Sequence, residues 1–259
     1  MSSSGLLGAF ASAAVFSFVV ACSTSEAGGV YYRADAADDV TDTKDAAAPD
    51  VLHDSSILSC TPADVTTFAP QPYVHAKDAH QGACTDAQIH AFYDDCLAPT
   101  ATQQTCAPFS GSSASTENKA CAACIVSRDS DPKLGPLVEH KGTISVNVAG
   151  CMEIADPANG LACAKAYQAA DACERAACSA NCPVTDEASF QLYLACVSDA
   201  AKTGCASFTS ALACVSAEAD AGASACFAGQ TFADSYLAVA PIFCGSAPDG
   251  GAPDASRAD

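Results

Sequence analysis

The sequence has few basic residues and few large apolar side chains. Its 259 residues include 11 Lys and Arg against 30 Asp and Glu, a formal net charge of −19. Such a chain repels nucleic acid and anionic lipid headgroups, so neither is expected as a direct partner. Tryptophan is absent, and only 2 Met and 11 Phe occur. Because alanine buries little area, the apolar core is predicted to be thin for this length.

Motifs that carry enzyme chemistry are also missing from the sequence. It contains no HExxH pair of zinc ligands, no GxSxG nucleophile motif and no glycine-rich phosphate loop. Neighbouring carboxylates such as Asp94-Asp95 belong to an acidic surface and need no special role. We therefore assign no catalytic residue, no metal ligand and no cofactor from the sequence.

Cysteine is the residue type in excess, with 17 in the chain. A reducing cytosol would leave so many thiols open to oxidation, so this density indicates an oxidising compartment. Disulfides can replace part of a thin core, since each contributes about 2–4 kcal/mol by restricting the unfolded chain. The composition therefore predicts an exported protein that disulfides stabilise.

The N-terminus has the features of an export signal. Residues 6–21 form an uncharged run that is too short and too rich in Ala and Ser for a membrane helix, and it fits a secretory signal. The run ends in Val19-Val20-Ala21-Cys22, which resembles the lipobox of bacterial lipoproteins. In that family the cysteine is diacylated and becomes the mature N-terminus. The resemblance thus implies a signal peptide over 1–21 and a lipid on Cys22 that anchors the protein to a membrane.

The number of cysteines favours lipidation. Removing Cys22 from the 17 leaves 16, an even number, whereas an odd cysteine would need a free thiol or another chain. Ser23 is not the Asp that tends to retain lipoproteins in the inner membrane, so the resemblance implies the outer membrane of a two-membrane cell. Ordinary cleavage after Ala21 or Ala27, with a periplasmic or secreted product, is the alternative.

Composition divides the rest of the chain. Residues 22–58 are rich in Ala, Asp, Ser and Thr and are predicted to be a disordered acidic tether. Residues 245–259 are predicted to be a disordered tail. Between them, two cysteine-rich helical units are expected, over 59–150, ending in a β-hairpin, and over 151–244.

The pattern of apolar residues in this body predicts a mainly α fold. Thr85 and Gln88 form a capping box that begins a helix with Ile89 and Phe92 on one face. Residues 137–148 alternate like a strand, and a turn at 141–142 would make one small β-hairpin. Further helices are expected after Thr116, over 161–173 and 174–180, after Asp186, and over 205–218 and 232–240.

The body cysteines are predicted to form disulfides, with the pairing left open. They are Cys60, Cys84, Cys96, Cys106, Cys121, Cys124, Cys151, Cys163, Cys173, Cys178, Cys182, Cys196, Cys205, Cys214, Cys226 and Cys244. A spacing of about 12 and then about 10 residues occurs twice, from Cys84 to Cys106 and from Cys151 to Cys173, which suggests an internal repeat.

Three short motifs follow the lipobox in a fixed order: a Cys-x-x-Cys at Cys121 and Cys124, Gly-Pro-Leu over 135–137, and Asn-Val-Ala-Gly-Cys over 147–151. In these features the chain resembles cysteine-rich predicted lipoproteins that are common in myxobacteria. The resemblance covers about the middle third of the body. It implies a location at the cell envelope and no particular activity.

Two groups of residues are candidates for chemistry. Cys121 and Cys124 could form a redox pair, but no βαβ pattern surrounds them, and Ile125 stands where haem attachment needs His. His75, His80 and His90 lie among aspartates, yet their spacing favours solvated polar residues over a metal site.

The expected function is a non-enzymatic module of the cell envelope that binds a protein or glycan or has a structural role. Two alternatives stay open. One is a carrier of an apolar small molecule, since disulfide-linked helices can hold a cavity open. The other is a thiol–disulfide oxidoreductase that uses Cys121 and Cys124.

Overall fold

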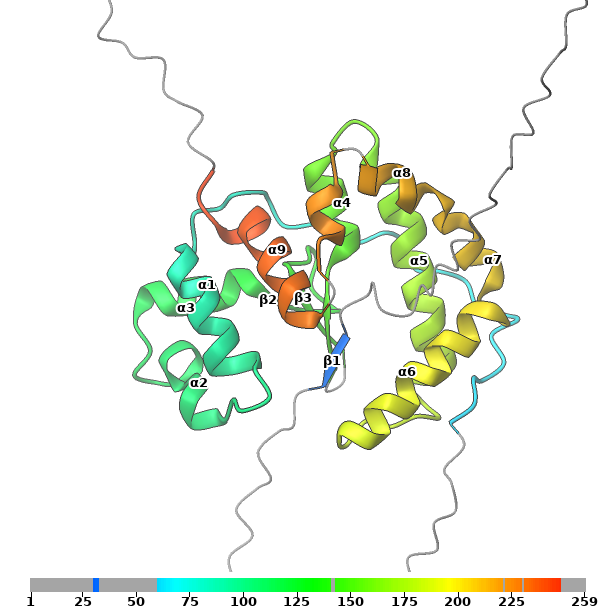
Figure 1. The fold of residues 1–259 in the computed structure, drawn as a ribbon, viewed down its shortest axis with the longest axis horizontal. Helices are drawn as coiled ribbons and strands as arrows, with labels where there is room; N and C mark the ends of the chain where they lie inside the picture. Colours follow the sequence, from blue (N-terminus) through cyan, green and yellow to red (C-terminus); the bar gives the residue numbers. More distant parts are fainter. Residues whose placement is uncertain (1–29, 33–59, 141–142, 221, 230, 248–259) are drawn as a thin grey trace, which may run out of the picture.

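Helices make up most of the protein. The computed structural model describes residues 30–32, 60–140, 143–220, 222–229 and 231–247. The helices are α1 (Asp86–Phe92), the π-helix η1 (Tyr93–Leu97), α2 (Gln103–Ser110), α3 (Thr116–Ile125), α4 (Val148–Ala155), α5 (Gly160–Cys178), α6 (Glu187–Lys202), α7 (Ala206–Thr209), η2 (Ser210–Ala213), α8 (Cys214–Asp220), η3 (Ser224–Phe227) and α9 (Phe232–Cys244). Figure 1 shows α1–α3 and α5–α7 on opposite sides of a small sheet. The predicted mainly α, disulfide-rich fold class is confirmed.

Side-chain caps determine where several helices begin. The predicted box at α1 is confirmed: the Gln88 N–H donates to Thr85 Oγ1 over 3.2 Å, and the Thr85 N–H donates to Gln88 Oε1 over 2.9 Å. Asp186 caps α6 in the same way, with Ser189 as its partner. The predicted break between residues 173 and 174 is wrong, because α5 runs without interruption through this alanine-rich stretch.

The sheet has four strands in the order β1-β4-β3-β2. The predicted hairpin is present as β3 (Leu137–His140) and β4 (Thr143–Val146), which pair antiparallel; its turn at 141–142 lies outside the described residues. Strand β2 (Val126–Arg128) continues from α3 and pairs parallel to β3. The alternation stops at Asn147, because its side chain caps α4 by accepting from the Gly150 N–H over 2.8 Å.

Strand β1 (Val30–Tyr32) pairs antiparallel with β4 and completes the sheet. These three residues fall within the stretch predicted to be a tether, and the sequence argument did not anticipate their pairing. Cys22, the predicted signal peptide over 1–21, the remaining tether and most of the predicted tail lie outside the described residues.

Eight disulfides join the described cysteines. The pairs are Cys60–Cys182, Cys84–Cys121, Cys96–Cys106, Cys124–Cys244, Cys151–Cys226, Cys163–Cys214, Cys173–Cys205 and Cys178–Cys196. The repeated cysteine spacing does not correspond to a repeated structure, because Cys96 bonds Cys106, whereas Cys163 and Cys173 bond two other partners.

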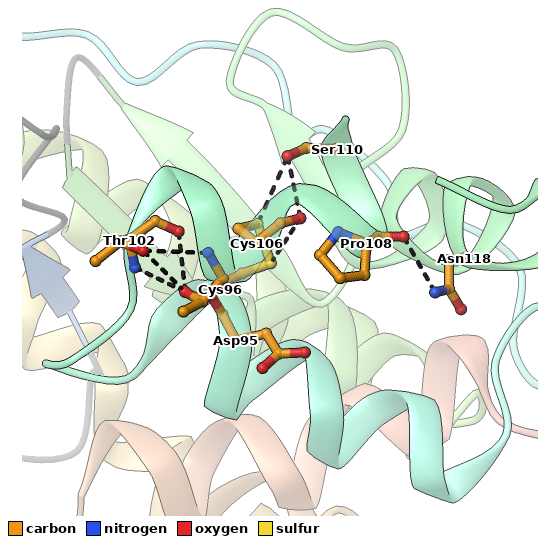
Figure 2. The surroundings of a disulfide bond; sticks show 8 residues. Asp95, Cys96, Thr102, Cys106, Pro108, Ser110 and Asn118 are labelled. Atoms are coloured by element: carbon orange, nitrogen blue, oxygen red, sulfur yellow. Dashed lines mark hydrogen bonds between the residues drawn. A yellow bond between two sulfur atoms is a disulfide. The ribbon is translucent and has the colours of Figure 1, made fainter. Parts of the chain in front are cut away.

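The disulfide Cys96–Cys106 links η1 to α2 (Figure 2). Thr102 caps α2, and Ser110 Oγ donates to the Cys106 carbonyl over 3.2 Å. Pro108 lies inside α2, and its carbonyl accepts from Asn118 Nδ2 over 3.1 Å, which ties α2 to α3. This proline lacks an N–H and obscures the helix in the sequence.

Two apolar cores lie in the body, and they do not follow the predicted division at residue 150. The larger core joins residues of α1–α4 and the sheet to α9, where Tyr236 and Phe243 are fully buried. The Tyr236 hydroxyl donates to the Ile89 carbonyl over 3.0 Å, so the C-terminal helix packs against the first one. The smaller core lies between α5, α6 and the segment 60–68.

Candidate functional site

A cleft of about 890 Å³ opens between the sheet and α5. Residues of β3, β4, α5 and the extended segment 70–75 line it. This volume falls in the range of roughly 300–1,000 Å³ that is typical of ligand pockets. The charged, imidazole and amide side chains along it are Gln71, His75, Asp129, His140, Asn147, Lys165, Gln168, Asp171 and Arg175, and Tyr73 and Tyr167 add two phenol groups.

Gln168 holds the segment 70–75 beside α5. Its Oε1 accepts from the Val74 N–H over 2.8 Å, and its Nε2 donates to the Val74 carbonyl over 3.1 Å. One amide side chain thus satisfies both backbone polar groups of Val74, as a neighbouring strand would. This two-point contact keeps the segment in place along the cleft.

Glu153 on α4 fixes the end of the same segment. Its carboxylate accepts from the Ala76 N–H over 2.9 Å, from Tyr73 Oη over 3.0 Å and from His75 Nδ1 over 2.5 Å. Burial alone would raise the pKa of Glu153, but these three contacts and the charge of His75 lower it below its ordinary value. Glu153 therefore stays ionised and holds Tyr73 and His75 at the cleft.

His140 and Asp129 form a hydrogen-bonded pair at the other side of the cleft. His140 Nδ1 lies 3.1 Å from Asp129 Oδ2. Burial and the nearby Arg175 charge lower the pKa of His140 to about 4, although Asp129 acts in the opposite direction. The imidazole is therefore neutral at neutral pH. With Nδ1 donating to Asp129, Nε2 remains a hydrogen-bond acceptor.

Arg175 and Asp171 form a second pair, one turn apart on α5. Burial lowers the pKa of Arg175, while Tyr193 and Asp129 raise it. A guanidinium keeps its charge under these conditions, and it has five N–H donors, more than one carboxylate can accept. The pair thus supplies donors and acceptors to the cleft with no net charge.

Apolar side chains complete the cleft. Leu134, Val138 and Val146 are buried along it, and Tyr167 is half-buried. Burial, together with Glu174, raises the pKa of Tyr167 to about 12, so its hydroxyl keeps its proton. Glu174 itself is on α5 but is not among the residues that line the cleft, and burial raises its pKa to about 7. The cleft therefore joins an apolar surface to a set of paired polar groups.

The CxxC cysteines do not form a pair with each other. Cys121 bonds Cys84 and Cys124 bonds Cys244, and the side chains of both are buried in the larger core. Cys124–Cys244 joins α3 to α9, and Cys84–Cys121 joins α3 to the residue just before the cap of α1, so the motif here is part of the covalent framework.

The three histidines considered as metal ligands have different surroundings. His75 bonds Glu153, whereas His80 has a positive φ of 45° and donates its backbone N–H to the Ile242 carbonyl. His90 is exposed on α1. Among the described residues, the metal-binding types of side chain converge at Cys60, Cys182 and Cys196, all of which are disulfide-bonded.

Sequence reasoning singled out His75 but missed the other ionisable groups of the cleft. The pair Asp171–Arg175 could have been predicted from the sequence, because opposite charges four residues apart in a helix pair readily. Asp129 and His140 had none, since their contact depends on the parallel pairing of β2 with β3.

No protein-family model matches the chain, and neither does any curated protein or solved structure. Within the described ranges, no helix has the length and apolar character needed to cross a membrane.

Proposed function

We propose that this protein is an exported module of the cell envelope that binds a hydroxylated ring ligand, such as a segment of a glycan, in the cleft between the sheet and α5. The observation that carries the proposal is the cleft itself, where paired polar groups lie along an apolar surface. The enzyme alternative through Cys121 and Cys124 is not proposed, because the two sulfurs belong to separate disulfides.

The pairing of the charges favours a neutral ligand with many hydroxyls. In the pairs Asp129–His140 and Asp171–Arg175, each cation or imidazole already faces a carboxylate. What remains for a ligand is a mixture of N–H donors with carboxylate and imidazole acceptors. A sugar hydroxyl both donates and accepts, so it matches such a mixture, while Lys165 adds one further donor.

The same groups argue against a carrier of a purely apolar molecule. Filling the cleft with such a ligand would remove water from Asp129, Asp171 and Arg175 without replacing its hydrogen bonds, which costs free energy. The half-buried side chains of Tyr167 and Val74 suit instead the apolar face of a sugar ring, whose edge carries the hydroxyls.

The proposal places the protein at the outer membrane, held by a lipid on Cys22 after removal of residues 1–21. The eight disulfides support an oxidising compartment, and the lipobox resemblance supports the anchor. Intact mass measurement of the protein from its native membrane tests this: a diacylglyceryl group on Cys22 is expected, and a mature chain without lipid would contradict the anchor.

Binding is tested on an array of neutral and acidic oligosaccharides, followed by calorimetric titration of those that bind. Lys165→Ala should weaken binding about 10-fold or more, the loss expected for one hydrogen bond to a charged group. Lys119→Ala is the matched control, because Lys119 is an exposed lysine on α3 outside the cleft. Absence of binding to every oligosaccharide, or an equal loss in the control, would refute the proposal.

A further inference from the structure

Three sulfur atoms from two different disulfides meet beside the smaller core. Those of Cys60, Cys182 and Cys196 all lie within 4.8 Å of one another. Cys60 bonds Cys182, and Cys196 bonds Cys178, so one disulfide lies next to the other. Elsewhere in the described chain, no other three cysteines gather in this way.

Solvent reaches this trio through one member. Cys60 is half-buried, whereas Cys178, Cys182 and Cys196 are buried. Among the four cysteines of these two disulfides, Cys60 is therefore the one at which an external thiolate would attack, because the other three are buried. Cys214 is also half-buried, but its disulfide with Cys163 has no third sulfur beside it.

We infer that Cys60, Cys182 and Cys196 form a thiol–disulfide exchange site whose partner is a dithiol. Exchange proceeds by attack of a thiolate on a disulfide sulfur, so it requires the attacking and attacked sulfurs to be close together. The trio meets this requirement, because release of Cys182 from Cys60 leaves its sulfur within 4.8 Å of Cys196. This inference does not depend on any ligand in the cleft.

The steps balance in atoms and electrons. One thiolate of the dithiol attacks Cys60, forms a mixed disulfide and expels the Cys182 thiolate. That thiolate attacks Cys196, forms the Cys182–Cys196 bond and expels Cys178, which takes a proton from water. The second thiolate of the dithiol then attacks the dithiol's first sulfur, which is bonded to Cys60. The Cys60 thiolate leaves and is protonated. The dithiol is oxidised, and two protein disulfides become one.

Exchange changes how the segment before the cleft is held. Cys60 begins the described stretch 60–140, and its disulfide is the cross-link that ties residues 60–75 to the region around Cys182. After exchange, the remaining contacts are weaker ones, such as the 2.8 Å hydrogen bond from the Ala63 N–H to the Ala177 carbonyl and the edge contact of Phe68 with Phe208.

The experiment uses the full chain with one body cysteine replaced, so that its former disulfide partner is left as a thiol. In Cys60→Ala, the Cys182 thiol lies beside the Cys178–Cys196 bond. In the control Cys214→Ala, the Cys163 thiol has no neighbouring disulfide. Each variant is held at pH 8.5, where a free thiol is about half ionised, then quenched with acid, unfolded, alkylated and mapped.

In Cys60→Ala the alkyl label should shift in part from Cys182 to Cys178, while in the control it should stay on Cys163. Label confined to Cys182 would overturn the inference, as would an equal spread of label in the control. A second measurement covers poor folding of the variant: the wild-type protein receives a limiting amount of dithiothreitol. Label should then appear on Cys60 and Cys178, and label on Cys60 and Cys182 alone would overturn the inference.

Discussion

Removing the Cys124–Cys244 disulfide should destabilise the protein more than removing Cys96–Cys106. The long bond spans 120 residues of sequence and the short one spans 10. In the unfolded chain, however, the other disulfides remain. The path between Cys124 and Cys244 then runs about 27 residues to Cys151, across its bond to Cys226, and about 18 residues onward, which makes a loop of about 45.

The chain-entropy relation gives about 4 kcal/mol for a loop of this size and about 2.7 kcal/mol for one of about 10 residues. The four cysteines are similarly buried, so replacement by alanine removes about the same packing at each site. We therefore expect C124A/C244A to lose about 1.3 kcal/mol more free energy of unfolding than C96A/C106A.

The comparison is made by guanidinium unfolding without reductant, followed by far-UV circular dichroism. Both double variants must keep the other cysteines paired, which is checked by intact mass after alkylation. If C96A/C106A is destabilised as much as C124A/C244A or more, the argument from loop length is refuted.

Three further predictions concern single side chains. The pKa of His140, whose side chain is 14% exposed, falls from 6.5 to about 4 on folding, so the wild type should lose up to about 3 kcal/mol as the pH falls from 6.5 towards 4. Urea unfolding of wild type and His140→Gln at pH 7.5 and 4.5 measures this loss of free energy of unfolding, which the variant should lack. Equal losses in the two proteins would refute the prediction. The pKa of Glu174 rises from 4.5 to about 7, so stability falls as the pH rises through this range; Glu174→Gln should be more stable than wild type at pH 8, by up to about 3 kcal/mol, and similar to it at pH 4. A difference that is the same at both pH values would contradict this. Thr85→Ala removes the cap of α1 and should lower the free energy of unfolding in urea by about 1 kcal/mol, whereas Thr100→Ala, at an exposed turn residue, should not.

Local signals in the sequence predicted local structure well. The cap at Thr85, the cap at Asp186 and the hairpin around 137–146 depend on residues within a few positions of one another. The start of α4 was missed because Val148 continues the alternation of β4, while the decisive contact is the cap from Asn147. Helix α2 was missed because Pro108 weakens the helical pattern.

The cleft could not be predicted, because distant pairings create it. Gln168 reaches Val74 and Glu153 reaches Ala76 only after α4 and α5 have packed beside the segment 70–75. The cysteine pairing also depends on the tertiary fold. Cys60 and Cys182 are 122 residues apart, and nothing near either of them in the sequence indicates the other.

Five of the eight disulfides are nested one within another along the chain. Cys178–Cys196 lies inside Cys173–Cys205, and these lie inside Cys163–Cys214, Cys151–Cys226 and Cys124–Cys244 in turn. Each inner bond therefore shortens the loop that the next must close. Once Cys178–Cys196 exists, the loop closed by Cys173–Cys205 falls from 32 residues to about 14, which saves about 0.7 kcal/mol of closure entropy.

Forming the five nested bonds from the centre outward therefore costs the least loop-closure entropy. Cys60–Cys182 departs from this order, because it crosses all five nested bonds and reaches into the innermost loop. Cys60, the first body cysteine along the chain, therefore pairs with a partner inside the innermost loop, and early oxidation of Cys60 with any nearer cysteine would have to be reversed before the native set is complete.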